Sequence, residues 1–269
     1  MDARLELDGR AVVRETPDAY HAPGPVQTLT GFAQGKAYWV KIGGAQADWD
    51  QPGDGGNYLP ATVGNRWDFG ITVSETGQST ATYNSTTTIT GTKGISSIQA
   101  LVFTHSNPDN SGIAEEEYRF KSTAGVAYYG NSDASDTLTR QLVPYDEGRF
   151  PVKIGSSFVQ INRTGLDYGE DLDGDGVNER VDVYSQVTVV GFESVTVDAG
   201  TFHNCVKLQT TLYATVSLSG YPIQVTVTNT LTEWYAPDVG PVKDHSVTSI
   251  PFIGWWSTQE ARLLSYNVQ

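Results

Sequence analysis

Apolar and polar residues alternate with a period of two through most of this 269-residue chain. Runs of this kind, rich in Val, Thr and Ile, cover residues 85–92, 183–202 and 211–234 and are interrupted by Gly, Pro, Asn or Asp. Because successive side chains of a strand point to opposite faces of a sheet, the pattern predicts strands that bury one face. The interruption at residues 219–222 (SGYP) predicts a bend between two paired strands. We therefore expect an all-β chain.

Four pairs of similar segments occur in the same order along the chain and predict a duplicated β unit of roughly 90–120 residues. The pairs are 58–69 with 149–160, 88–95 with 187–195, 116–126 with 232–242, and 139–145 with 261–266. Segment 112–122 alone has some helical character, but its counterpart near residue 234 reads as a strand, so we expect a strand there too. Chance similarity among Gly-rich β sequences is the alternative explanation of the pairs.

The repeat divides the chain into four parts. We expect an N-terminal β arm, or the remnant of a preceding domain, at residues 1–46, a linker at 47–57, a first β unit at 58–148 and a second at 149–269. The two related antiparallel units are expected to form a curved sheet, a half-barrel or a sandwich.

The balance of charge restricts the partners. A net charge of −14, with only 18% charged residues, argues against nucleic acid and anionic membrane surfaces as partners.

The sequence contains no run of 18 apolar residues, which a transmembrane helix would need. The lone Cys205 excludes an internal disulfide, and the residues after Met1 lack the apolar region of a signal peptide. The chain is thus either cytosolic or has lost its signal peptide. We favour the second alternative, with an extracellular, cell-surface or periplasmic location.

The most specific motif is an acidic loop at residues 171–182 (DLDGDGVNERVD). A hard cation such as calcium takes six to eight oxygen ligands, and carboxylates at alternate positions of a tight loop converge on one ion. The predicted calcium ligands, in EF-hand-like order, are Asp171, Asp173, Asp175, the Val177 carbonyl, Glu179 and Asp182, with Gly176 at the turn. The alternative is a solvated acidic turn. Since the flanks read as strands, a bound cation is expected to stabilise a hairpin rather than to act as a helix-loop-helix sensor.

Motifs of catalysis are missing. The sequence contains no G-x-S-x-G, H-E-x-x-H, G-x-x-x-x-G-K-[ST] or G-x-G-x-x-G. His203 and Cys205 share one face of a strand, but a small buried thiol explains Cys205 better than a catalytic pair does. We expect no enzymatic activity.

One apolar stretch is absent from the corresponding place of the first unit. Residues 249–256 contain Phe252, Ile253, Trp255 and Trp256, where the first unit has polar residues. The stretch either caps an open end of the sheet or is an exposed anchor for another subunit, a lipid or a sugar.

Three phrases resemble a loose group of uncharacterised bacterial exported and lipoprotein-like β proteins. They are YLPATVGNRWDF (58–69), VTVDAGTFHNCVKLQT (195–210) and TEWYAPDVGPVK (232–243). The resemblance covers roughly residues 58–269. It implies a curved antiparallel sheet similar to the half-barrels of periplasmic lipoprotein carriers, and it implies no established activity.

Three functions remain open at this point. The first is a non-catalytic, calcium-stabilised structural or assembly subunit of the bacterial cell surface. It would self-associate as a homo-oligomer through strands or through residues 249–256. The alternative is a periplasmic module that binds a lipid or another small apolar ligand. The third is a hydrolase of unknown substrate, which would need a cleft where a histidine meets a carboxylate and a nucleophile.

Overall fold

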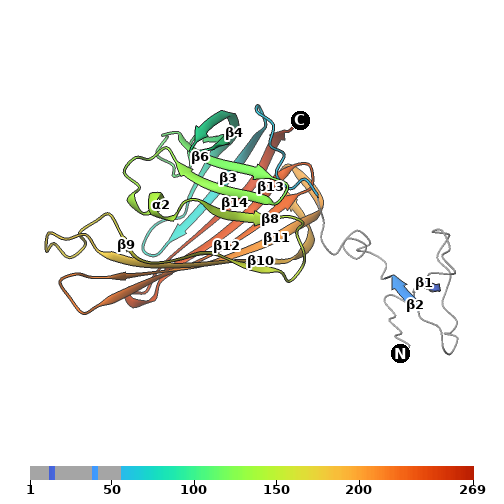
Figure 1. Ribbon diagram of the computed structural model, residues 1–269. Helices are drawn as coiled ribbons and strands as arrows, with labels where there is room; N and C mark the ends of the chain where they lie inside the picture. Colours follow the sequence, from blue (N-terminus) through green and yellow to red (C-terminus); the bar gives the residue numbers. More distant parts are fainter. Residues whose placement is uncertain (1–11, 16–37, 42–55) are drawn as a thin grey trace. The chain divides into compact units, whose positions relative to one another are not determined.

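Twelve strands of the C-terminal part of the chain form one antiparallel sheet (Figure 1). The computed structural model describes residues 12–15, 38–41 and 56–269. The strands of the sheet are β3 (Arg66–Glu75), β4 (Ala81–Ile95), β5 (Ile98–His105), β6 (Glu115–Ser122), β7 (Gly125–Asn131), β8 (Tyr145–Arg149), β9 (Ser157–Asp167), β10 (Arg180–Val197), β11 (Gly200–Ser217), β12 (Gln224–Ala236), β13 (Gly240–Ile250) and β14 (Trp255–Asn267). Their order in the sheet is β8-β7-β6-β5-β4-β3-β14-β13-β12-β11-β10-β9. The prediction of an all-β fold is confirmed.

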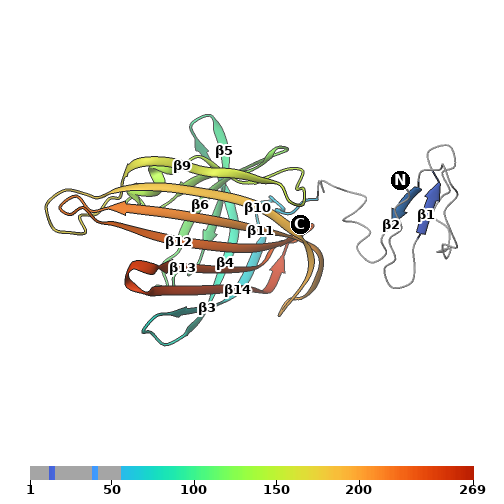
Figure 2. The same ribbon diagram turned by 90° about the horizontal axis from the view of Figure 1, so that it is seen from below.

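The sheet curls (Figure 2), and its two edge strands, β8 and β9, contact each other. Each strand pairs with its neighbours in the chain, except that β8 and β9 form the edges and β3 pairs with β14. In the β3–β14 pair, Ile71 lies opposite Ala261. Across the gap between the edges, the Gln160 side chain of β9 donates a hydrogen bond to the Asp146 carbonyl of β8 at 3.0 Å. The result is a nearly closed, half-barrel-like sheet rather than a sandwich.

Strand β10 shows how the alternating sequence makes one face of the curved sheet apolar. Its inward side chains, which include Val181, Val183, Val187 and Val189, are each under 10% exposed, whereas their neighbours in the chain are more exposed. The predicted strand near residue 116 is confirmed as β6, and residues 219–222 do form the turn between β11 and β12. The alternation therefore gives the sheet an apolar concave face.

A short helix that the sequence did not predict covers part of this face. Helix α2 (Thr137–Leu142) begins at Asp136, whose carboxylate accepts a hydrogen bond from the Thr139 N–H at 2.9 Å. Leu142 packs in one cluster with Val181 and Val183 of β10. The Asp136 cap stabilises this helical turn before β8 begins.

The two predicted β units correspond to two runs of the sheet. The first unit, 58–148, contains β3 to nearly all of β8, and the second, 149–269, contains β9 to β14. Gly91 on β4 and Gly191 on β10, which the repeat pairs, both stand at a register shift against the following strand. A common origin of the two units stays a prediction.

The described residues before position 52 belong to a unit distinct from the one that contains the sheet. There, β1 (Val12–Glu15) pairs antiparallel with β2 (Tyr38–Lys41). The rest of the predicted arm at 1–46, and most of the predicted linker at 47–57, lie outside the described residues.

Candidate functional site

The concave face of the sheet encloses a cavity of about 740 Å³. Apolar side chains from both halves of the sheet line much of it, among them Phe69, Ile71, Val187, Val189, Val206 and Leu208. These residues come from β3, β10 and β11, where alternate positions point inward. A cavity of this size is within the range that holds small organic ligands, roughly 300–1,000 Å³.

A charged network stands on the same face, at inward positions of β5, β6 and β8. Arg119 Nη1 donates to Glu117 Oε2 at 2.6 Å, and Arg119 Nε donates to Glu147 Oε2 at 2.8 Å. His105 Nε2 lies 2.8 Å from the same Glu117 oxygen. The side chains of Arg119 and Glu117 keep 20% and 26% of their surface exposed, on the lining of the cavity. The guanidinium of Arg119 is therefore shared between two carboxylates.

The network shifts the pKa values of its carboxyls. Burial favours the neutral form of Glu117, but Arg119 and His105 outweigh it and hold its pKa well below the usual range. For Glu147 the effect of burial dominates over Arg119, and its pKa is raised. Arg119 thus stabilises the negative charge of Glu117 more than that of Glu147.

A second pair of carboxylates has no basic partner of this kind. Glu233 on β12 lies directly opposite Asp244 on β13, and both line the cavity. Burial raises the pKa of Asp244 to about 7, and the neighbouring Glu233 adds to this shift. Burial also raises the pKa of Glu233, although its Oε1 accepts a hydrogen bond from the Tyr235 hydroxyl at 2.6 Å. Asp244 Oδ1 is buried and has no hydrogen-bond partner among the described residues.

His105 also contacts a hydroxyl. Its Nδ1 lies 2.9 Å from Thr87 Oγ1, and Thr87 lines the cavity as well. When Nε2 donates its proton to Glu117, Nδ1 is the acceptor for the Thr87 hydroxyl. Hydroxyl, imidazole and carboxylate therefore form one chain of hydrogen bonds.

Sequence reasoning missed the charged residues on the wall of this cavity. The available signal was the period-two placement of Glu115, Glu117 and Arg119 on a predicted strand, which puts all three side chains on one face. The alternation of side chains does not show whether this face is the concave or the convex one, because that depends on how the whole sheet curls.

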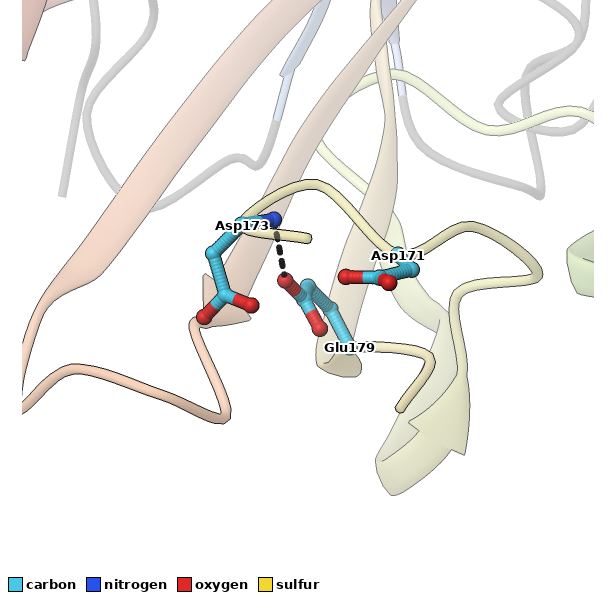
Figure 3. A group of neighbouring side chains, drawn as sticks. All are labelled: Asp171, Asp173 and Glu179. Carbon is cyan, nitrogen blue, oxygen red and sulfur yellow. Dashed lines mark hydrogen bonds between the residues drawn. The ribbon is translucent and has the colours of Figure 1, made fainter. Parts of the chain in front are cut away.

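The acidic loop between β9 and β10 brings three of its predicted ligands together (Figure 3). Carboxylate oxygens of Asp171, Asp173 and Glu179 all lie within 4.8 Å of one another. Glu179 is fully buried, and its Oε1 accepts hydrogen bonds from the N–H groups of Leu172 and Asp173 at 3.1 and 3.2 Å. Backbone N–H groups, that of Gly176 above all, lower the pKa of the Asp171 carboxyl. Oxygen ligands in this arrangement suit a hard divalent cation.

The other three predicted ligands do not belong to this group of oxygens, although Asp175 and Val177 are joined to it through the Ser219 hydroxyl. The Asp175 carboxylate accepts hydrogen bonds from the Val177 N–H at 2.8 Å and from the Ser219 hydroxyl at 3.0 Å. The Val177 carbonyl lies 3.5 Å from the Ser219 hydroxyl. Asp182 is already part of β10, and its Oδ1 accepts from the Gly165 N–H of β9 at 2.7 Å. The cluster therefore closes at the ninth loop position rather than at the twelfth.

The acidic loop is joined to the turn between β11 and β12. Asp173 Oδ2 accepts a hydrogen bond from the Gly220 N–H at 2.7 Å, and Ser219 contacts both Asp175 and Glu179. A cation held by this loop would thus stabilise the ends of two neighbouring hairpins.

Two of the predicted partner-binding residues, Phe252 and Ile253, lie in the short helix η2 (Pro251–Ile253) between β13 and β14, and Trp255 and Trp256 begin β14. Phe252, Ile253 and Trp256 are 67%, 65% and 46% exposed. Trp255 is more buried, and its indole N–H donates to Glu75 on β3 at 2.9 Å. Three of the four side chains are therefore accessible, and Trp255 helps to join β14 to β3.

Cys205 is fully buried, and burial raises the pKa of its thiol to about 11. His203 instead contacts the Ser194 hydroxyl at 2.9 Å. The interpretation of Cys205 as a buried thiol is confirmed.

Comparison with known proteins gives a match over part of the chain. Residues 175–247 match the DUF3108-like family model. A proposed exported protein with a YmcC-like fold from Bacteroides fragilis is 14% identical, with 78% of this chain and 98% of that chain covered and a TM-score of 0.35. A proposed lipoprotein from Parabacteroides distasonis is 16% identical with the same coverage and a TM-score of 0.39. No curated protein matches the chain.

Among the described residues, no helix is long and apolar enough to span a membrane.

Proposed function

We propose that residues 56–269 form a non-catalytic, extracytoplasmic binding module that holds a small, largely apolar molecule on its concave face. The observation that carries the proposal is the cavity of about 740 Å³ with Phe69, Val187, Val206 and similar side chains on its wall. Proteins usually fill an interior of this kind with side chains, because an apolar wall without contacts forfeits packing energy. A ligand would supply those contacts.

A matched pair of substitutions tests the proposal. Ser246 lines the cavity, whereas the next residue on β13, Val247, is 38% exposed and is not among the lining residues. We expect wild-type protein to bind the uncharged fluorescent probe N-phenyl-1-naphthylamine. Ser246→Trp should weaken that binding by at least about tenfold, because the indole occupies ligand volume, and Val247→Trp should leave it unchanged. Equal binding by all three proteins, or none by the wild type, would contradict the proposal.

We further propose that the ion held by the acidic loop is calcium and that its role is structural. The support is an all-oxygen set of carboxylates, Asp171, Asp173 and Glu179, at the ends of two hairpins.

Assembly through the apolar turn is a second candidate function. It is favoured by the exposure of Phe252, Ile253 and Trp256 on neighbouring positions of one turn. Light scattering in millimolar calcium, and again after chelation, tests it. An assembly that Phe252→Ser disperses would support a structural role, and a monomer under both conditions would remove it.

A hydrolase is a further candidate, because His105 lies between Thr87 and Glu117 within the cavity. Against it, Glu117 is also paired with Arg119, which stabilises its negative charge and makes it a weaker base. Turnover of an ester or amide substrate that Thr87→Val abolishes would establish this activity.

A further inference from the structure

The charges on the concave face do not balance. Carboxylates of Glu115, Glu117, Glu147, Glu233 and Asp244 line the cavity. Arg119 is already bound to Glu117 and Glu147, at 2.6 and 2.8 Å. The interior of the cavity is therefore acidic, and Glu115, Glu233 and Asp244 are the three carboxylates that Arg119 does not contact through a hydrogen bond.

The pair formed by Glu233 and Asp244 is the least satisfied part of this face. The two residues are directly opposed on neighbouring antiparallel strands, an arrangement in which like charges repel. Asp244 Oδ1 has no hydrogen-bond partner among the described residues although it is buried. A buried polar atom without a partner costs free energy unless a ligand or water satisfies it. Its place on the cavity wall makes a ligand group the natural donor.

Other charged groups near Asp244 do not supply that donor. Lys243, its neighbour on β13, is paired with Glu260 of β14 at 2.9 Å. Glu260 and Glu233 both act to keep Asp244 neutral, and Tyr83 of β4 is the other titratable group influenced by its charge. Burial, Glu233 and Glu260 raise the pKa of Asp244 to about 7, against the opposing effects of the Ala261 backbone hydrogen bond and of Lys243. This carboxyl is therefore only partly ionised near neutral pH, and a bound cation would favour its charged form.

The geometry favours an organic cation over a metal ion. Among the described residues, the acidic loop is the one place where three or more ligand atoms of His, Cys, Asp or Glu come within 4.8 Å of one another. Glu233 and Asp244 do not belong to such a group. A protonated amine needs only two or three acceptors and brings its own hydrogen-bond donors.

An anionic ligand is disfavoured inside the cavity. Arg149 and Lys153 also line it, but both are exposed, and Arg149 is paired with Asp146 at 2.9 Å. Their positive charges are solvated and do not offset the carboxylates of the interior.

We propose that the ligand of this cavity is an amphipathic cation, whose protonated amine is bound by Asp244 and Glu233 while its apolar part lies against Val187, Val189 and Leu208. This inference rests on the proposed binding function and specifies its ligand class. It assigns Asp244 and Glu233 as binding residues.

Three probes of equal chain length test the inference. Decylammonium, decanol and decanoate differ in head-group charge, and each contains ten carbons in a linear chain. Their affinities are measured at pH 8 by displacement of N-phenyl-1-naphthylamine. We expect wild-type protein to bind decylammonium at least about tenfold more tightly than decanol, and decanoate more weakly than decanol.

Asp244→Asn should abolish most of the preference for decylammonium and leave decanol binding unchanged. This variant removes a buried charge, so it is expected to fold. Glu260→Gln, which removes a carboxylate from the adjacent strand that does not line the cavity, is the matched control and should retain the preference.

The affinities of the three probes distinguish failure of the cation inference from failure of the proposed binding function. Equal affinities for the three probes, or tightest binding of decanoate, would overturn the cation inference and leave the binding function standing. A preference that survives in Asp244→Asn would overturn the assignment of Asp244. If no probe binds and the naphthylamine itself does not bind, the proposed function fails and the inference fails with it.

Discussion

Asp244 and Glu117 are carboxylates on the same concave face, yet their surroundings shift their pKa values in opposite directions. Glu117 has Arg119 as a direct partner, and Asp244 has another carboxylate, Glu233, opposite it. Burial favours the neutral form of both carboxyls, and the charge of the neighbouring group either outweighs this effect, as at Glu117, or adds to it, as at Asp244. The two residues therefore make opposite predictions for stability against pH.

Replacing Asp244 with Asn should stabilise the protein at high pH. The folded-state pKa of about 7 lies above the ordinary 3.8, so the folded protein binds more protons between these values. Wild-type stability must then fall as the pH rises through that window. At about 1.4 kcal/mol per pH unit, the gain for Asp244→Asn at pH 8 is at most about 4 kcal/mol, and near pH 4 it vanishes. Urea unfolding at the two pH values measures it. A loss of stability at pH 8 would contradict the assignment.

Replacing Arg119 with Met should have the opposite pH dependence. The variant leaves Glu117 and Glu147 buried without their cation, which costs roughly 3–5 kcal/mol at neutral pH. Because Arg119 depresses the pKa of Glu117, this penalty should shrink as the pH falls below the ordinary value of 4.5. Arg149→Met is the control. Its pair with Asp146 is about half exposed and should contribute less than about 1 kcal/mol. Equal losses of stability in Arg119→Met and Arg149→Met would contradict the claim that the buried ion pairs of Arg119 contribute more than the exposed pair of Arg149.

At the scale of elements, the sequence predicted some features well and others incompletely. The Asp-rich loop was recognisable because its carboxylates alternate around glycines. Whether the set closes at Glu179 or at Asp182 depends on where β10 begins, and Asp182 lies within that strand. Helix α2 was missed because it has only six residues and its cap, Asp136, stands in a segment that reads as a polar loop.

Calcium binding distinguishes the ligand set that ends at Glu179 from the predicted set that ends at Asp182. Calcium at about 100 times its dissociation constant should stabilise the fold by roughly 2.7 kcal/mol, seen as a rise in Tm that chelation reverses. Asp171→Asn should weaken calcium binding by at least about tenfold, as it removes a charged ligand oxygen. Asp182→Asn should leave calcium affinity unchanged, since that side chain bonds to Gly165 instead. Calorimetric titration measures both. A larger loss in Asp182→Asn would restore the twelve-residue ligand set.

At the scale of the whole molecule, the strands were readable from local alternation, but their closure was not. The pairing of β3 with β14 joins residues almost 200 positions apart, as in Ile71 with Ala261. Only this closure turns inward-facing residues of β5, β6, β8, β12 and β13 into one cavity wall. For that reason, the sequence predicted the curved sheet and a possible apolar ligand, but not the charged cluster that would select it.

The most direct measurement is mass spectrometry of small molecules extracted from purified protein after incubation with a total bacterial extract of lipids and metabolites. We predict that wild-type protein and Val247→Trp retain about one amphipathic molecule per chain, with a basic nitrogen, and that Ser246→Trp retains none. A wild-type protein that retains no small molecule, or a Ser246→Trp variant that retains the same amount, would contradict the binding function.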